Sequence, residues 1–173
     1  TQAAILIQGN NIIAEYYGEG YDKVSLATSW SVAKSFTSTL IGIAIDEGYI
    51  SSIDDPITDY LPEWKGKDQD NILLKHLLAM QSGMDDHPFA GVIFSTDMVK
   101  YSLDRNIARP PEKAFSYSNE DSMLLGKILE NATGMSVQNY ADKKLFDILE
   151  VEDKWWTDQA GNTVTYASLD MTP

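Results

Sequence analysis

Short apolar runs separated by turn residues open the chain. Residues 3–8 and 12–17 read AAILIQ and IIAEYY, and a Gly-Asn-Asn turn lies between them. Two β-like runs around such a turn are typical of a β-hairpin. The pattern therefore predicts one hairpin within residues 1–20. It predicts a second hairpin over 154–167, around the Ala-Gly-Asn turn at 160–162.

In the middle of the chain, apolar residues recur at helical spacing. A buried core helix is predicted from about residue 30 to Gly48 because apolar side chains return there every three or four positions. These are Val32, Phe36, Leu40, Ile43 and Ala44. Further helices are expected over 71–83, 97–105, 120–133 and 136–149. Residues 84–95 are expected to be irregular, and the whole helical region covers residues 29–150.

This order of elements favours an α+β fold. A hairpin, a core helix, a cluster of helices and a second hairpin suggest helices packed on an antiparallel sheet. The sheet is expected to be incomplete, because two terminal hairpins supply few strands for so many helices. A chain of 173 residues suits one domain or a large part of one, so residues 1–173 are taken as a single, partial domain.

Charge and cysteine content narrow the possible partners. The formal net charge of −13 argues against nucleic-acid backbones and anionic membranes. The sequence has no cysteine, which excludes disulfides, thiolate metal ligands and cysteine nucleophiles. No apolar run reaches the roughly 18 residues that span a bilayer. The sequence does not decide between a periplasmic or secreted location and a cytoplasmic one in a bacterium.

The stretch TSWSVAKSFTS, residues 28–38, places a serine and a lysine one helical turn apart. Ser31 and Lys34 then lie on nearly the same helix face, since a turn takes about 3.6 residues. A neutral lysine amine can remove the proton of a serine hydroxyl and make it nucleophilic. The backbone N–H of Ser31, at the helix N-terminus, can stabilise an oxyanion. The plainer alternative is a solvated surface lysine, because about one Ser-x-x-Lys is expected by chance in such a chain.

A second group of polar residues precedes a later helix. FSYSNED, residues 115–121, places Tyr117 and Asn119 on either side of Ser118. A loop there can aim a phenol and a carboxamide at one point, with the phenol as base or proton relay. The alternative is a helix N-cap by Ser118 or Asn119, with Tyr117 packed beneath it.

Four motifs in sequence order resemble the serine β-lactamase and penicillin-binding-protein superfamily. SVAKSF resembles its Ser-x-x-Lys nucleophile motif. The other three are GIAIDEGYISSIDDPITDYLPEW, ILLKHLLAMQSGM and FSYSNEDSMLLGKILENATGMS, the last of which resembles the Tyr-x-Asn loop and its following helix. The chain is most similar to the class C β-lactamase-like branch, close to its esterase and 6-aminohexanoate oligomer hydrolase members. The similarity covers nearly the whole chain.

The resemblance implies a β-lactamase/transpeptidase-like fold and a role for each matching residue. Ser31 corresponds to the nucleophile, Lys34 to its activating partner, Tyr117 to the general acid/base and Asn119 to a substrate-orienting amide donor. His87, in the stretch DDHPF, corresponds to a segment over the pocket and is a candidate substrate contact. No metal and no organic cofactor is implied.

Two departures from the family pattern affect these expectations. Family members are longer and continue into further helices and a strand with a Lys-Thr-Gly or His-x-Gly type motif, which supplies the second oxyanion N–H. The chain is therefore expected to be a fragment whose partner is the missing C-terminal segment. Where the family usually has Pro-Pro-Gly, this chain has PPEK, so the turn at Glu112 has to form without glycine.

The resulting functional hypothesis is a serine hydrolase that acts on an ester, amide or β-lactam carbonyl through an acyl-enzyme on Ser31. One alternative is a penicillin-recognising D,D-peptidase or sensor that turns over slowly. Another is a non-catalytic binding domain that retains the motif by descent. The sequence leaves the substrate open among these carbonyl compounds.

Overall fold

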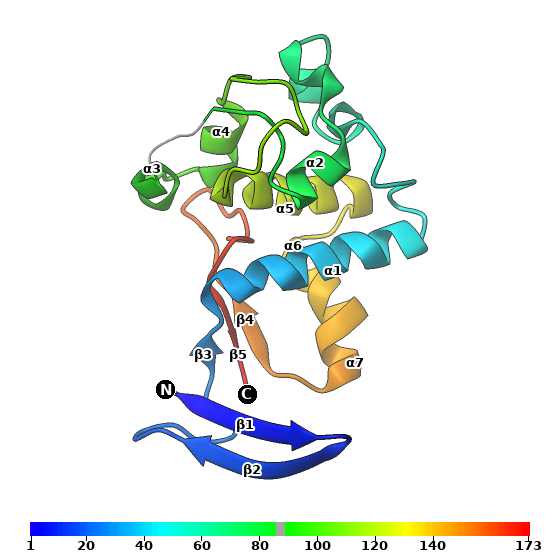
Figure 1. Ribbon diagram of the computed structural model, residues 1–173. Helices are drawn as coiled ribbons and strands as arrows, with labels where there is room; N and C mark the ends of the chain where they lie inside the picture. The colour runs from blue at the N-terminus through cyan, green and yellow to red at the C-terminus, as the bar shows by residue number, and fades with distance from the viewer. Residues whose placement is uncertain (86–88) are drawn as a thin grey trace.

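Helix α1 divides the molecule, with helices α2 to α5 on one side and all strands on the other (Figure 1). The computed structural model describes residues 1–85 and 89–173. Its strands are β1 (Ala3–Gln8), β2 (Asn11–Tyr17), β3 (Ala27–Thr28), β4 (Asp153–Trp155) and β5 (Leu169–Met171). Its helices are α1 (Ala33–Asp46), α2 (Leu74–Leu78), α3 (Phe89–Phe94), α4 (Met98–Leu103), α5 (Asn119–Thr133), α6 (Val137–Ala141) and α7 (Asp147–Leu149).

Shorter helical turns connect these elements. Single turns of 3-10 helix occupy Trp30–Val32, Ile57–Asp59, Pro62–Trp64 and Asp68–Asn71. A π-helical turn, Asp142–Phe146, joins α6 to α7. None of the helices in the described part of the chain is long and apolar enough to cross a bilayer.

The strands of residues 1–85 and 89–173 form two separate antiparallel sheets. β1 and β2 pair only with each other. In the second sheet β5 is central: Asp170 lies opposite Thr28 of β3, and Leu169 lies opposite Trp155 of β4. Strand β5 therefore ties the segment just before α1 to the C-terminal part of the chain. The mixture of helices and small antiparallel sheets agrees with the predicted α+β class.

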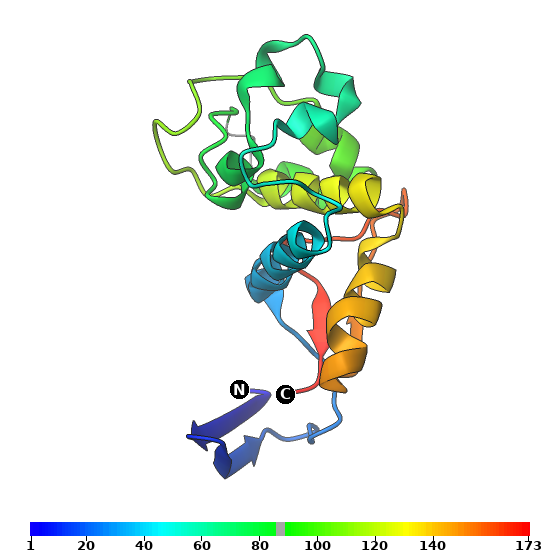
Figure 2. The same ribbon diagram turned by 90° about the vertical axis from the view of Figure 1, so that its right-hand side faces the viewer.

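The β1–β2 hairpin projects from the rest of the molecule (Figures 1 and 2). Five of its large apolar side chains are between 53% and 61% exposed: Leu6, Ile7, Ile12, Ile13 and Tyr16. Isolated two-stranded hairpins are marginally stable in water, and apolar groups on both faces favour burial against a further element.

The main core lies between α1 and α5, which pack against each other. Leu40, Ile41 and Ala44 of α1 are buried against Leu124 and Ile128 of α5. Fully burying one such side chain contributes about 1.5–3 kcal/mol. The segment 57–78 adds Ile57, Leu61, Trp64, Ile72, Leu74 and Leu77 to the same core. This packing fixes the two helix N-termini relative to each other.

Several element boundaries differ from the sequence prediction. Val32 was expected on the buried face of the core helix, but it is 57% exposed. It belongs to a 3-10 turn, whose three residues per turn carry its side chain away from that face. Residues 84–95 were expected to be irregular, yet α3 forms there. A Cβ on Gly91 would lie 2.0 Å from the Tyr101 hydroxyl of α4, so close packing supports a short helix that sequence alone does not favour.

The C-terminal strand pair coincides only in part with the range 154–167, since Lys154 and Trp155 lie inside it and β5 lies beyond it. Inside the range, Thr157 and Thr163 form a single antiparallel bridge on either side of the predicted turn. β4 begins at Asp153, and its partner β5 ends at Met171. The turn at 160–162 is present, since the Asp158 N–H donates to the Asn162 carbonyl at 2.9 Å. Between the paired strands, residues 156–168 leave the ladder and reach α1 and α5.

Gly126 lets this excursion approach α5 closely. A Cβ on Gly126 would lie 2.5 Å from Cγ2 and 2.9 Å from Oγ1 of Thr165. Real Cβ atoms do not tolerate such distances, so only glycine fits this helix position. Thr165 is fully buried, which leaves its side chain little room to move away.

The turn at PPEK, which has to form without glycine, places Glu112 at φ +66°. Its backbone N–H donates to the Gln81 carbonyl at 3.0 Å. Its carboxylate accepts from His76 Nε2 at 2.9 Å and pairs with Lys75 Nζ at 3.3 Å. His76 Nδ1 accepts the Leu73 N–H, so the ring proton is on Nε2. These contacts hold Glu112 in the left-handed backbone conformation, which is uncommon for a residue other than glycine.

We expect Gly126→Ala to lower the free energy of unfolding. Overpacking against Thr165 costs about 1–3 kcal/mol, whereas alanine gains only about 1 kcal/mol of helix propensity. The matched control is Gly42→Ala in α1, where a new Cβ meets nothing within 4 Å. Denaturant unfolding should show Gly42→Ala stabilised and Gly126→Ala destabilised. Equal shifts in the two variants would contradict the close approach of Thr165.

We also expect part of the stability to be lost in acid through Glu112. Its hydrogen bond from His76 and its contact with Lys75 hold the pKa of the Glu112 carboxyl below its ordinary value of 4.5. A lowered folded-state pKa means that the ionised form stabilises the fold above pH 4.5, and that this contribution is lost as the pH falls through the folded-state pKa. Melting temperatures measured from neutral pH down to about pH 3 should fall less steeply for Glu112→Gln than for the wild type.

Candidate active site

Ser31 lies in the 3-10 turn that leads into α1. The Ser29 N–H donates to the Leu169 carbonyl at 2.8 Å, which fixes the start of this turn to the central strand β5. Trp30 then adopts φ +48°, an uncommon conformation for a non-glycine residue. The bend presents Ser31 at the surface, where it is exposed.

Lys34 lies in the first turn of α1, and its amine is held beside Ser31. Its Nζ is 3.3 Å from Ser31 Oγ and donates to the Tyr166 carbonyl at 2.8 Å. It also lies 4.9 Å from the ring centre of Tyr117 and 5.4 Å from that of Tyr166, within the range of cation–π contacts. The amine is thus held among protein groups, so the surface-lysine alternative does not describe its position.

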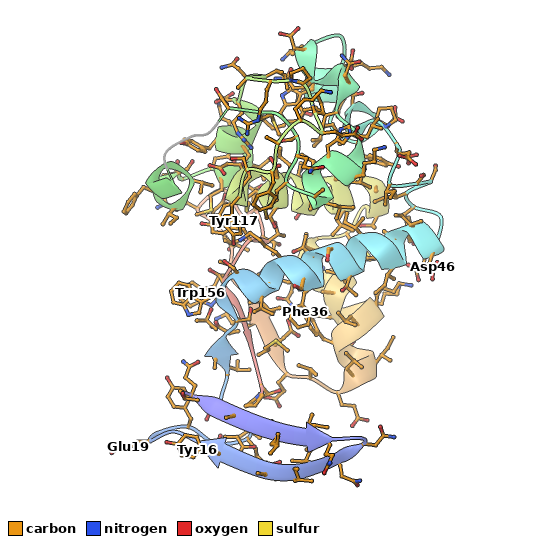
Figure 3. All side chains as sticks on the ribbon, viewed as in Figure 1. Tyr16, Glu19, Phe36, Asp46, Tyr117 and Trp156 are labelled. Carbon is orange, nitrogen blue, oxygen red and sulfur yellow. The ribbon has the colours of Figure 1, made fainter. Side chains whose placement is uncertain are left out.

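Tyr117 reaches the same hydroxyl from the loop before α5. Its OH donates to Ser31 Oγ at 3.0 Å. Figure 3 shows Tyr117 between α5 and the N-terminal end of α1. Partial burial raises the pKa of the Tyr117 phenol, but hydrogen bonds with Lys34 and Ser31 and the charge of Lys34 outweigh it. The resulting pKa lies below the ordinary value of 10.0, which favours the phenolate.

The carbonyl of Tyr166 is part of this site, and no pattern in the sequence indicates it. The preceding residue, Thr165, is clamped between α1 and α5: its carbonyl accepts from Thr37 Oγ1 at 2.9 Å and from Ser122 Oγ at 3.2 Å. Its own hydroxyl donates to the Ser122 carbonyl at 2.7 Å. This clamp positions the next carbonyl, that of Tyr166, at the Lys34 amine. A backbone carbonyl has no residue-type signature, so no motif could have indicated it.

Asn119 is placed differently from the other three predicted residues. It is the first residue of α5 and is only 4% exposed. Within the described residues, no hydrogen bond joins its carboxamide to Ser31, Lys34 or Tyr117. The N-cap of α5 is Ser118, whose Oγ accepts from the Asp121 N–H at 3.0 Å. His87 lies outside the described residues.

Together these groups form a polar cluster with one exposed hydroxyl at its centre. Ser31 Oγ is within hydrogen-bonding distance of an amine and of a phenol. Such a cluster can remove the hydroxyl proton and return it to a leaving group. In residues 1–85 and 89–173, no three His, Cys, Asp or Glu side chains gather in a way that could hold a metal ion.

Comparison with known proteins identifies a family for this chain. The family model described as Beta-lactamase matches residues 1–172. A 6-aminohexanoate-dimer hydrolase from Paenarthrobacter ureafaciens is 35% identical over 85 residues, which are 49% of this chain and 21% of that protein.

Solved structures share the fold. A Bacillus anthracis protein, provisionally named a 6-aminohexanoate-dimer hydrolase, superimposes with a TM-score of 0.85 at 22% identity, over 99% of this chain and 50% of that one. A β-lactamase/D-alanine carboxypeptidase from Yersinia pestis gives 0.77 at 21% identity, over 99% and 59%. The chain thus spans between 50% and 59% of the length of these two proteins. The match to the family model over residues 1–172 establishes that this chain belongs to the Beta-lactamase family.

Proposed function

We propose that the protein containing this chain is a serine hydrolase that forms an acyl-enzyme on Ser31. The observation that carries the proposal is the convergence of the Lys34 amine and the Tyr117 phenol on Ser31 Oγ, at 3.3 Å and 3.0 Å. The substrate class is an ester, amide or β-lactam carbonyl. Family membership and the hydrolase names of the relatives support this class.

In the first step, Ser31 Oγ attacks the carbonyl carbon of the substrate. Its proton passes to Tyr117, because the neighbouring Lys34 charge favours the phenolate that accepts it. The developing oxyanion is stabilised by the backbone N–H of Ser31 near the N-terminus of α1. The phenol then returns the proton to the leaving group. Attack by water on the ester of Ser31 completes the cycle with the same proton carriers.

Asn119 and His87 have substrate-orienting roles in this proposal. Asn119 follows Tyr117 by two residues and comes from the same loop and helix junction. A carboxamide can donate to a substrate carbonyl and accept from a substrate N–H. No metal or organic cofactor is needed for the reaction.

The remainder of the site is proposed to come from a C-terminal segment of the same protein. The chain covers about half of the solved relatives, and Ser31 is open to solvent. The exposed β1–β2 hairpin gives independent support, because its apolar faces suit burial against further strands. That segment would supply the second oxyanion donor, whose loss typically costs about 100- to 1000-fold in rate.

A second candidate function keeps the acylation step but slows deacylation. The relative from Yersinia pestis is named a β-lactamase/D-alanine carboxypeptidase, which favours a D,D-peptidase or penicillin sensor as this alternative. A non-catalytic binding domain is the remaining possibility, and it would leave Ser31 unreactive.

We expect Ser31→Ala to abolish covalent labelling of the full-length protein by a fluorescent fluorophosphonate. The matched control is Ser35→Ala, which changes another exposed serine one turn further along α1. It should be labelled like the wild type. A fluorescent penicillin then separates the candidates, since rapid loss of its label indicates a hydrolase and a persistent label indicates a sensor. No label on the wild-type protein with either probe would leave only a binding domain.

We expect Tyr117→Phe to slow acylation of Ser31 by about 100- to 10,000-fold, the usual contribution of a general base. The wild-type acylation rate should rise with pH and level off below pH 10, because the pKa of Tyr117 is lowered and its phenolate is the active form. The variant should lack this rise. Tyr49→Phe, just beyond the opposite end of α1, serves as the control. An unchanged pH profile in Tyr117→Phe would assign the base to Lys34 alone.

A further inference from the structure

A buried ion pair lies beneath the loop that carries Tyr117. Arg105 Nη1 is 2.8 Å from Asp121 Oδ1, and the two side chains are only 3% and 1% exposed. Ser82 Oγ donates to the same carboxylate oxygen at 3.1 Å. The other oxygen, Asp121 Oδ2, is buried and has no hydrogen-bond partner in the part of the chain that the structure describes.

The guanidinium of Arg105 joins its own loop to Asp85 and to the start of α5. Its Nε and Nη2 donate to the Asp85 carbonyl at 3.0 Å and 2.8 Å. Its Nη1 donates to Ser118 Oγ at 3.1 Å as well as to Asp121. The planar guanidinium can satisfy all these acceptors at once, which a lysine ammonium cannot do in the same geometry.

Tyr117 itself is held mainly through its neighbours. Its side chain is 54% exposed, so packing restrains it little. On one side, the Ser116 N–H donates to the Met80 carbonyl at 3.0 Å. On the other side, Ser118 Oγ accepts from both the Asp121 N–H and Arg105. The backbone at Tyr117 is therefore fixed between a carbonyl and the buried cation.

Stability alone does not account for a fully buried ion pair at this place. Removing two charges from water is costly, and apolar residues of similar size often stabilise a fold as well or better. The ion pair does supply directional bonds to the residue next to Tyr117, which apolar residues cannot supply.

We propose that Arg105 and Asp121 are positioning residues for Tyr117: they fix Ser118 and thereby hold the phenol within 3.0 Å of Ser31 Oγ. The inference rests on the proposed function for its catalytic meaning, but the placement of the phenol can be measured without any substrate. Loss of the pair leaves Ser118 Oγ with the backbone N–H of residue 121 as its only hydrogen-bond donor among the described residues, and the exposed Tyr117 side chain moves away from Ser31 and Lys34.

The test uses the double variant Arg105→Met/Asp121→Leu in the full-length protein. It removes both charges together and leaves neither one buried alone, so the fold is expected to persist. The protein is labelled with ¹³C at the tyrosine ζ carbons, and Tyr117→Phe assigns the Tyr117 signal. In the wild type this signal should titrate below pH 10, as the position beside Lys34 requires. In the double variant its pKa should rise towards that of an exposed tyrosine.

The acylation rate of Ser31 with a fluorophosphonate gives the second measurement. We expect the double variant to be about 10- to 100-fold slower, since a misplacement of about 1 Å at a reacting group can cost about 100-fold. The control is Leu129→Ala, in the same helix about 15 Å from its start. It creates a cavity and lowers stability, but should leave both the titration and the rate unchanged.

A folded double variant with the wild-type titration of Tyr117 overturns the inference. The same result in Arg105→Met overturns it as well, whatever the stability of that variant. A raised pKa in the double variant supports the inference even if the wild-type protein is not labelled at Ser31. A wild-type protein that is not labelled at Ser31 would refute only the proposed hydrolase activity. The two proposals can therefore be refuted independently of each other.

Discussion

The segment of residues 164–166 is the constraint on which the rest of the structure depends. It crosses between α1 and α5 near the N-terminal ends of both helices. Thr165 bonds to Thr37 of one helix and Ser122 of the other, and Gly126 permits the close approach. The next carbonyl receives the Lys34 amine. Without this crossing, the Lys34 amine would lose its shortest hydrogen bond and, among the described residues, would keep only Ser31 Oγ and the Tyr117 ring as contacts.

The parts of the site that depend on local spacing were predictable. Ser31 and Lys34 are three residues apart, and a helical turn brings such residues together wherever it forms. Tyr117 was predictable only from its motif, since 86 residues separate it from Ser31 and the contact is made by helix packing. The Tyr166 carbonyl was not predictable, because every residue carries one. The role of Arg105 was not predictable either, because a single arginine in a loop is typical of a solvent-exposed surface charge.

The same distinction holds for the fold. The helices α1 and α5 follow from long periodic apolar patterns, and their bounds lie close to the predicted ones. α3 was missed, because its six residues are too few for a clear period and Gly91 is a poor helix former. It forms where its backbone packs closely on Tyr101. In the second sheet, the pairs between β3 and β5 join residues more than 140 positions apart, such as Thr28 and Asp170, which no local pattern can register.

The use of a main-chain acceptor for Lys34 has a consequence for how the site tolerates genetic change. A carbonyl oxygen persists through every substitution at its own position, so point mutation cannot delete it. It can be displaced only indirectly, through the groups that hold Thr165 or by altering the chain length between the paired strands β4 and β5, where the excursion over residues 156–168 sets its place. Among descendants of this sequence, insertions and deletions in that interval should therefore be under stronger purifying selection than replacements of Tyr166 itself.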